Sequence, residues 1–521
     1  MRPQDIRICI TDGELGRYCA LSYRWGPPDQ VYKTTRANLS RMIQNIDWDV
    51  LPRLVQDAIT VTRELDIEYL WIDALCIIQG DEEDWHIESA KMGQYYTKAF
   101  LTIAASSSPG VQMPFLGPRV RPDETSSFSS SSPEFKFCNT EGTETTIIGR
   151  RVLEYAGVTL TGNTLLASRG WAWQENALSV RIVHYTNREL IWECRYCQIL
   201  ENGARLRNSD TSLAYRFAAA CQEQTGKAHG QLEYYWKTLV TEFSLRQLTY
   251  ESDRLAAISG VAAEIQKSLM LTPDSPGTDS QYLVGLWRPW LHSDLMWTTN
   301  WPSLTNPSVV SRASTLPSWS WLSIIGQVFF AYQLLKLTGL RKTRPRPLHI
   351  IHVACEPLRG AYPFGDVQAG ASITLTGYLF SAALCSKNTS HFPSYRLLVD
   401  GLDSRMGPDT VLEGMDLVGP DGAVLERTAR RRLRPAPPSE EPDVLYATVY
   451  CLFIAGGWFK ENISSRWMTH TSQGSFYLVL GRSASSLTST GLGNVFTRVG
   501  SAQSDGSKMP KVAKLTEIVL I

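Results

Sequence analysis

The chain has 521 residues, 43% of them hydrophobic and 20% charged, and its 51 Lys and Arg balance its 51 Asp and Glu. This length exceeds one ordinary domain, and about three units are expected. The lack of a basic excess argues against a nucleic-acid-binding protein. Tryptophan is unusually frequent, at 16 residues, and six of these lie between 287 and 321. Because indole rings are large and mostly buried, we expect one aromatic cluster near the amino terminus and another in this stretch.

The sequence carries no signal for secretion or for a membrane span. The amino terminus contains acidic residues and has no apolar stretch of signal-peptide length. The most apolar long window, residues 324–340, is interrupted by two glutamines and a lysine. Several cysteines lie inside apolar runs, as buried reduced thiols do. We therefore predict a cytoplasmic protein without a membrane span, with the nucleus as the alternative location.

Patterns for metals and common cofactors are weak. Cys194 and Cys197 form the only CxxC pair, and without a second pair or a nearby histidine this favours a structural role over zinc. His349 and His352 would point to opposite faces of a strand. The sequence also lacks a P-loop and a complete GxGxxG motif. We predict no metal site and no required cofactor.

Strand and helix patterns alternate along residues 1–200. Buried strands are predicted at Tyr18–Tyr23, Tyr69–Ile78 and Phe100–Ala105. Helical spacing of apolar residues covers 51–65, and Asp84 is a plausible N-cap for a second helix. Strand, helix, strand, helix, strand indicates parallel βαβ units, so we expect an α/β domain.

The rest of the chain divides by pattern into further segments. The pattern degrades over residues 106–166, where Ser126–Pro133 is nearly pure serine, and this indicates an inserted surface loop. Residues 201–310 form a helical, tryptophan-rich connecting region. Residues 311–521 alternate apolar and polar positions, which predicts a mixed, β-rich region with a disordered loop near 401–442.

Three tryptophan-bearing motifs stand out in the amino-terminal part. They are ALSYRWG at Ala20–Gly26, LWIDALCIIQ at Leu70–Gln79, and RGWAWQE at Arg169–Glu175. In content, order and separation they resemble the fungal heterokaryon-incompatibility (HET) domain family, and the resemblance covers roughly residues 10 to 190. Several long motifs in the right order are far more specific than one short pattern.

The resemblance implies an effector of fungal non-self recognition that triggers programmed cell death through protein partners or self-association. The family is also remotely similar to the TIR domain, a flavodoxin-like α/β fold whose enzymatic members cleave NAD with a glutamate. We therefore expect a flavodoxin/TIR-like parallel sheet with helices in residues 1–200, and NAD is a candidate substrate. Fold-level analogy raises this expectation without assigning an activity.

Glu175 is the first candidate catalytic residue, because it lies in the motif most similar to the tryptophan-and-glutamate segment of NAD-cleaving TIR domains. A carboxylate can stabilise the oxocarbenium-like state that forms when a nicotinamide–ribose bond breaks. The neighbouring Trp171 could stack a base. The alternative is that Glu175 pairs with Arg169 to hold a helix end.

Asp73 is the second candidate catalytic residue, since a carboxylate inside an apolar strand must be paired or hydrogen-bonded. The carboxyl ends of parallel strands face the ligand crevice, so Asp73 is expected near side chains that follow the first strand. Alternatively, Asp73 only binds Arg169 or backbone amides. The predicted ligand-binding residues are Ser22, Arg24, Trp25, Gln79, Arg169 and Trp171.

Other functions remain open, because the motifs themselves carry no established chemistry. The HET-like region begins almost at residue 1 and no recognition repeats follow it, which would suit a tailoring enzyme of fungal secondary metabolism, such as an isomerase, cyclase or hydrolase. Such an enzyme would bind a small hydrophobic molecule. A third reading is a catalytically dead binding module whose pocket is filled by Trp71 and Trp173.

Overall fold

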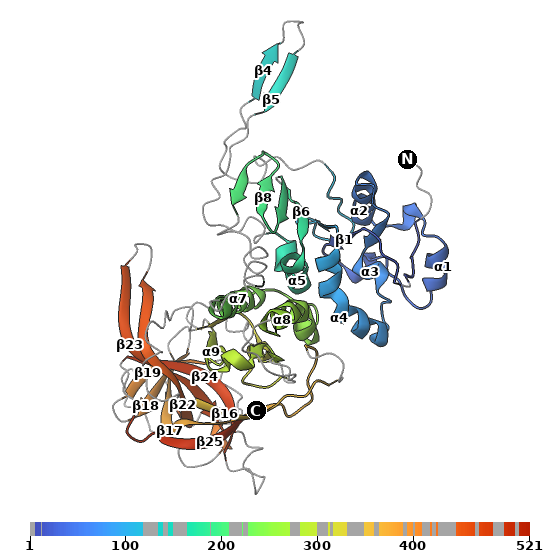
Figure 1. Ribbon diagram of the computed structural model, residues 1–521. Helices are drawn as coiled ribbons and strands as arrows, with labels where there is room; N and C mark the ends of the chain where they lie inside the picture. The colour runs from blue at the N-terminus through green and yellow to red at the C-terminus, as the bar shows by residue number, and fades with distance from the viewer. Residues whose placement is uncertain are drawn as a thin grey trace. The chain divides into compact units, whose positions relative to one another are not determined.

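The computed structural model of the chain contains two compact units (Figure 1). The first comprises residues 1–223 with 246–248, and the second comprises residues 224–245 with 249–521. The structure describes residues 6–11, 13–117, 134–138, 144–148, 164–187, 189–207, 221, 228–270, 282–299, 311–312, 316–330, 348–358, 364–388, 393–399, 402–408, 417–418, 424–425, 444–463, 468–482, 494–505 and 510–521.

The first unit is built on a seven-stranded sheet with the order β2-β1-β3-β6-β7-β8-β9. Its strands are β1 (Tyr18–Ser22), β2 (Tyr69–Trp71), β3 (Leu101–Ala104), β6 (Arg181–Tyr185), β7 (Leu190–Cys194), β8 (Cys197–Leu200) and β9 (Arg205–Arg207). The pairings among β2, β1, β3 and β6 are parallel, and those from β6 to β9 are antiparallel. The predicted α/β domain is confirmed, but its sheet is mixed and not wholly parallel.

Helices cover both faces of this sheet. They are α1 (Leu39–Gln44), α2 (Arg53–Glu64), α3 (Asp73–Cys76), α4 (Glu82–Lys98) and α5 (Gly170–Leu178). Successive strand residues point to opposite faces. Leu21 accordingly packs in a cluster with Leu54 of α2, whereas its neighbour Ala20 packs in another with Tyr96 of α4. No helix among the described residues is long and apolar enough to cross a membrane.

The second predicted strand is shorter than expected. Only Tyr69–Trp71 pairs with β1, and one turn of helix, α3, begins at Asp73. The Oδ1 atom of Asp73 accepts the backbone amide of Ala74 at 2.7 Å, and a carboxylate at the first helical position is favoured by the positive end of the helix. Asp73 therefore lies directly after the carboxyl end of β2 and not within a strand.

The start of α4 also differs from the prediction. Asp81 caps the helix, and its side chain accepts the backbone amides of Glu83 and Asp84. Asp84, the predicted cap, instead accepts the amide of Ile78 at 2.7 Å through Oδ2. From the sequence, either aspartate could be the N-cap of α4. The path of the loop after α3 determines which of them caps the helix.

The predicted surface loop over 106–166 contains a hairpin. It consists of β4 (Glu134–Cys138) and β5 (Glu144–Ile148), which pair in antiparallel register. The segment ETTII of β5 is rich in β-branched residues, which favour strands. The serine stretch Ser126–Pro133 lies outside the described residues.

The second unit begins with two helices and several short strand pairs. The helices are α7 (Ala228–Phe243), α8 (Arg254–Met270) and the short α9 (Leu291–Asp294). The short strands are β10 (Tyr282–Leu283), β11 (Leu286–Trp287), β12 (Trp297–Thr299), β13 (Ser311–Arg312), β14 (Ile324–Ile325) and β15 (Val328–Phe330). Four tryptophans of the predicted second aromatic cluster are fully buried here, Trp287, Trp297, Trp319 and Trp321, and so is Trp236 of α7.

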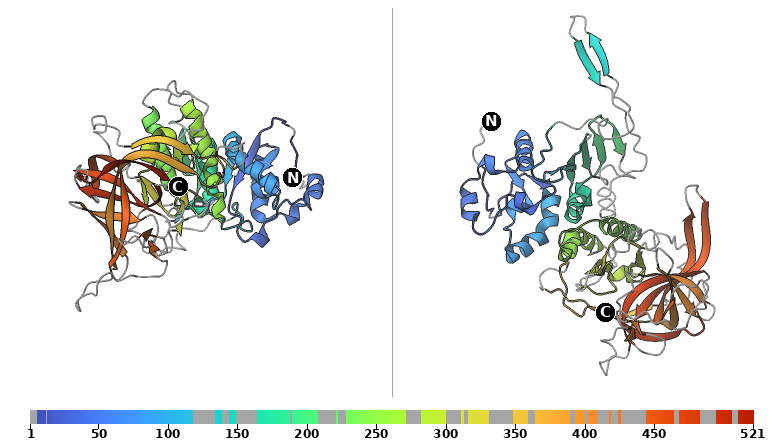
Figure 2. Two further views of the ribbon diagram at one scale, coloured as in Figure 1. Left: turned by 90° about the horizontal axis from the view of Figure 1, so that it is seen from below. Right: turned by 180° about the vertical axis from the view of Figure 1, so that it is seen from behind.

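The carboxyl-terminal part is an eight-stranded sheet, in agreement with the predicted β-rich region (Figure 2). Its strands are β16 (Leu348–Ala354), β17 (Ser372–Asn388), β18 (Pro393–Val399), β19 (Leu402–Pro408), β22 (Val444–Ile463), β23 (Met468–Gly481), β24 (Val495–Asp505) and β25 (Lys514–Leu520). All pairs are antiparallel except β24 with β25. A separate hairpin joins β20 (Leu417–Val418) and β21 (Val424–Leu425).

The predicted loop near 401–442 starts with ordered structure. Residues 402–408 form β19, which pairs with both β18 and β24. The sequence had instead predicted these residues to lie inside the loop. Three consecutive arginines of the predicted loop, Arg430–Arg432, lie outside the described residues.

Candidate functional site

Four of the predicted site residues converge at the carboxyl ends of two neighbouring parallel strands. Ser22 is the last residue of β1, and Asp73 follows β2. Arg169 is the N-cap of α5 and Glu175 lies inside that helix. In parallel α/β sheets this edge is where ligands bind. We refer to these four residues as the edge cluster.

Asp73 is the best-satisfied member of the edge cluster. Its carboxylate is 7% exposed, and Oδ2 accepts the indole N–H of Trp25 at 2.9 Å. The other oxygen accepts the amide of Ala74, and the guanidinium of Arg169 lies 3.7 Å from Oδ2. Both predicted roles for Asp73, binding Arg169 and binding a backbone amide, therefore occur together. Burying a carboxylate is costly unless it has such partners.

Arg169 bridges Asp73 and the residue that follows β1. Its NH1 atom donates to the backbone carbonyl of Tyr23 at 2.5 Å, and its side chain is 23% exposed. Burial alone would lower the pKa of Arg169, but the carboxylates of Asp73 and Glu175 raise it above its ordinary value. The guanidinium is therefore a permanent positive charge that remains partly open to solvent.

The helix that carries Glu175 is fixed by a close contact at its first residue. The amide of Gly170 donates to the carbonyl of Gln247 at 2.8 Å. A Cβ atom on Gly170 would lie 2.5 Å from Leu248, so only glycine fits without a shift. This contact explains the glycine of the third motif and sets the direction in which Glu175 points.

Glu175 is 2% exposed and titrates in an unusual range. Burial raises its pKa from 4.5 to about 7, although the positive charge of Arg169 and a hydrogen bond with Ser22 lower it. The negative charge of Asp73 raises it further. The carboxyl group of Glu175 can therefore gain or lose a proton near neutral pH, as general acids and bases do.

Two tyrosines complete the surroundings of Glu175, and the sequence reading did not single them out as site residues. The hydroxyl of Tyr96 donates to the carbonyl of Leu21 at 2.9 Å. Burial and nearby carboxylates raise the pKa of both Tyr23 and Tyr96 well above 10, so both stay protonated. Tyr23 lies between Ser22 and an arginine in the first motif, and this position is the signal that could have identified it.

The remaining predicted ligand-binding residues lie outside the edge cluster. Gln79 donates to the carbonyls of Asp73 at 3.3 Å and Ile77 at 3.0 Å, so it holds the turn of α3. Within the described residues, Arg24 makes no hydrogen bond or ion pair. Trp171 packs against the cluster that contains Trp71.

The aromatic side chains near the site are packed into the interior. Trp71 is 9% exposed and stacks on Tyr95 with ring centroids 4.8 Å apart. Trp173 is 5% exposed. Trp25 contacts the edge cluster through its hydrogen bond to Asp73. The predicted stacking surface for a base thus depends on Trp25 and the half-buried Trp171.

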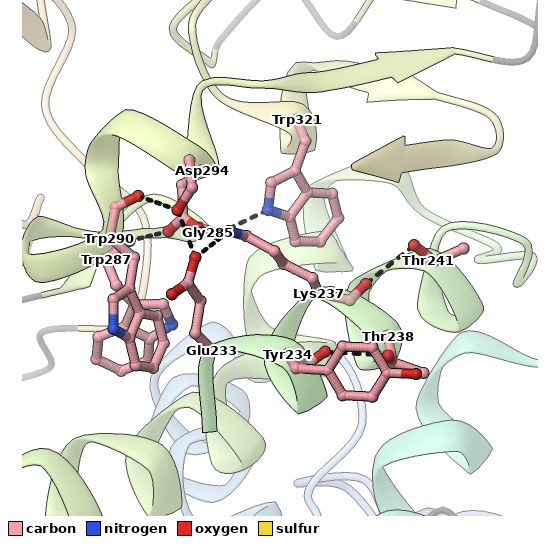
Figure 3. Close-up of polar contacts among 11 residues, drawn as sticks. Glu233, Tyr234, Lys237, Thr238, Thr241, Gly285, Trp287, Trp290, Asp294 and Trp321 are labelled. Atoms are coloured by element: carbon pink, nitrogen blue, oxygen red, sulfur yellow. Dashed lines mark hydrogen bonds and ion pairs between the residues drawn. The ribbon is translucent and has the colours of Figure 1, made fainter. Parts of the chain in front are cut away.

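A second group of buried charges lies in the second unit (Figure 3). Lys237 is fully buried, and its Nζ lies 2.5 Å from Glu233 and 3.4 Å from Asp294. The amide of Trp287 donates to Asp294 at 2.8 Å, and Ser293 donates to Glu233 at 2.5 Å. Burial raises the pKa of Asp294 to about 7, while Lys237 lowers it. We call these three charged residues the interior cluster.

The metal prediction and the comparisons with known proteins complete the description of the site. Among the described residues, no group of three or more His, Cys, Asp and Glu side chains could hold a metal ion.

No curated protein and no solved structure matches the chain significantly. Residues 18–175 match the family model described as heterokaryon incompatibility protein (HET), a range that begins with β1 and contains the whole edge cluster. Residues 18–175 are therefore similar to the heterokaryon incompatibility (HET) domain, and this match covers less than half of the chain.

Proposed function

We propose that the chain is a heterokaryon-incompatibility-type effector of fungal non-self recognition whose amino-terminal domain cleaves NAD with Glu175. One observation carries this proposal. A glutamate whose pKa is raised to about 7 lies beside a second carboxylate and a partly exposed guanidinium, at the ligand-binding edge of a parallel sheet. NAD cleavage would start a cell-death response in the cytoplasm. Self-association or protein partners would trigger the cleavage.

The strand order supports a flavodoxin/TIR-like assignment for this domain. The parallel strands follow the order β2-β1-β3-β6, which is the first part of the doubly wound order 2-1-3-4-5. In such sheets the chain reverses its direction of winding between the first and third strands, and a nucleotide binds above their carboxyl ends. Ser22 ends β1 at this point.

The chemistry assigns a different task to each charged side chain. Cleavage transfers water to the ribose carbon and releases nicotinamide, and positive charge develops on the ribose as the bond breaks. Ionised Glu175 would stabilise that charge and accept a proton from the attacking water. Arg169 would bind a phosphate oxygen, and Asp73 would hold the guanidinium in place.

Release of nicotinamide from NAD by the purified full chain tests the proposal. We expect turnover by the wild type at high protein concentration or with a crowding agent, and a loss of at least about 100-fold in Glu175→Gln. Glu193→Gln is the matched control, because Glu193 is also a buried glutamate of the first unit, at 3% exposure, and lies in β7 outside the edge cluster. Equal rates in wild type and Glu175→Gln would overturn the catalytic role.

A second candidate function, a binding module without catalysis, is favoured by the burial of Trp71 and Trp173. This candidate predicts that NAD raises the thermal unfolding temperature of the chain while no nicotinamide is released. Arg169→Met would abolish that shift in temperature. The tailoring enzyme of secondary metabolism stays a prediction from the sequence.

A further inference from the structure

The CxxC pair lies at the tip of a tight hairpin in the first unit. Strand β7 ends at Cys194 and β8 begins at Cys197, so only two residues form the turn. The preceding pair, Glu193 and Gln198, is in register and is joined by a hydrogen bond of 2.9 Å. This register places the two cysteines opposite each other, with their Sγ atoms 3.9 Å apart.

The two cysteines lie on the less buried face of the hairpin. Side chains alternate between the faces of a strand. Glu193 and Gln198 are buried at 3% and 1% exposure, so the cysteines next to them point to the opposite face, where both are half-buried. The turn residue Tyr196 is 86% exposed. A small molecule in solution can therefore approach the sulfur atoms.

The surroundings of Cys194 favour a thiolate. Burial opposes ionisation, but hydrogen bonds from the backbone amides of Tyr196 and Cys197, from the side chain of Trp192 and from the Cys197 thiol lower the pKa of Cys194 below 9. Burial and the hydrogen bond to Cys194 raise the pKa of Cys197. The pair is thus asymmetric, because the pKa of Cys194 is lowered and that of Cys197 is raised.

Other cysteines of the chain have the opposite character. Burial raises the pKa of Cys76 to about 11 and that of Cys451 to about 12. Both would stay protonated and unreactive near neutral pH, because the thiolate is the reactive species. The hairpin pair differs from them in its hydrogen bonds as well as in its access to solvent.

We propose that Cys194 and Cys197 form a redox site that reacts with low-molecular-weight disulfides such as glutathione disulfide and closes reversibly to an intramolecular disulfide. Cys194 is the attacking residue and Cys197 is the resolving residue. This site lies outside the edge cluster, and the inference does not depend on NAD cleavage.

The reaction balances as two exchange steps. The Cys194 thiolate attacks one sulfur of glutathione disulfide, the sulfur–sulfur bond breaks, and one glutathione leaves as a thiolate that takes up a proton. Cys197 then loses its proton to solvent and attacks the Cys194 sulfur, which releases the second glutathione. The pair loses two electrons, and these reduce the glutathione disulfide. The sulfur atoms move from 3.9 Å to a bond of about 2.05 Å.

A structural zinc site is the competing use of a CxxC pair. Zinc requires four ligands, usually two such pairs or a pair with histidines. The described residues place no third His, Cys, Asp or Glu with these two cysteines in a group that could hold a metal. Two opposed sulfurs across a two-residue turn suit dithiol chemistry.

The test treats the reduced full chain with glutathione disulfide at neutral pH, blocks remaining thiols, and maps the peptides by mass spectrometry. We expect the peptide that contains residues 194–197 to lose two hydrogen masses and to regain them with excess reduced glutathione. In Cys197→Ser, glutathione should stay attached to Cys194. In Cys194→Ser, attachment at Cys197 should be at least about tenfold slower. Cys9→Ser, which removes an exposed cysteine elsewhere, should leave the reaction unchanged.

Three results would overturn the proposal. The pair stays reduced in wild type, or the two single variants react at equal rates, or the purified chain holds stoichiometric zinc that either variant releases. Alkylation rates measured in the wild type test the proposal without relying on variants that could misfold. There Cys194 should react at least about tenfold faster than Cys76.

Discussion

The edge cluster and the interior cluster contain the same kinds of charge but differ in their surroundings. Each cluster contains one cation and two carboxylates. In both clusters, burial raises the pKa of one of the two carboxyl groups to about 7. Lys237 is fully buried, whereas the side chain of Arg169 is 23% exposed. A raised pKa alone therefore does not identify a functional site. Access of solvent to the cation and a position at the carboxyl ends of parallel strands separate the two.

The largest expected effect comes from removing the buried cation of the interior cluster. Lys237→Met leaves Glu233 and Asp294 buried without a positive partner, and breaking such a group costs about 3–5 kcal/mol of unfolding free energy. Chemical denaturation measures this cost. Lys267→Met is the control, because Lys267 is 65% exposed in its pair with Glu264 and should cost less than about 1 kcal/mol. Similar losses in both variants would contradict an interior role for Lys237.

The next effect concerns the pH dependence of stability, which both clusters should share. The folded pKa values of Glu175 and Asp294, both about 7, exceed the ordinary 4.5 and 3.8, so the folded state binds more protons between those values. The free energy of unfolding should therefore fall as the pH rises from about 4 through 7, by up to about 3 kcal/mol for Glu175 and up to about 4 kcal/mol for Asp294. Glu175→Gln and Asp294→Asn cannot ionise and should each lose part of this dependence. Denaturation at several pH values checks this, and unchanged slopes in both variants would refute the raised pKa values.

The smallest expected effect tests how Arg169 changes the pKa of Glu175. Because its charge lowers the pKa of Glu175, Arg169→Met should raise that pKa above about 7. Carbon-13 NMR of labelled glutamate carboxyl groups follows the titration directly. Arg181→Met is the control, since Arg181 binds the carbonyl of Phe100 and does not contact the edge cluster. If Arg169→Met left the pKa of Glu175 unchanged, the proposed influence of the guanidinium on that pKa would be wrong.

The sequence predicted the edge cluster better than the interior cluster, for a physical reason. The βαβ pattern implies parallel strands, and parallel strands bring their carboxyl ends together, so Ser22 and Asp73 could be placed side by side before the structure was known. Lys237 and Asp294 lie far apart in the chain and belong to no motif. Their contact depends on how α7 and α9 pack, which no local pattern encodes.

Local boundaries were harder to predict than the order of elements. The apolar run from Tyr69 to Ile78 reads as one strand, but it stops pairing with β1 after Trp71, and Asp73 then starts a helical turn. Pairing partners decide where such a run ends. The hydrogen bonds around Cys194 were equally hidden, because they depend on the geometry of a two-residue turn.

The central claim is that ionised Glu175 cleaves NAD, and the pH profile of nicotinamide release tests it most directly. The account predicts that the wild-type rate rises as the pH passes through about 7, because Glu175 must lose its proton, and that Glu175→Gln removes the activity while Glu193→Gln retains it. A wild-type chain that releases no nicotinamide at any pH, or a Glu175→Gln variant with the wild-type rate, would contradict it.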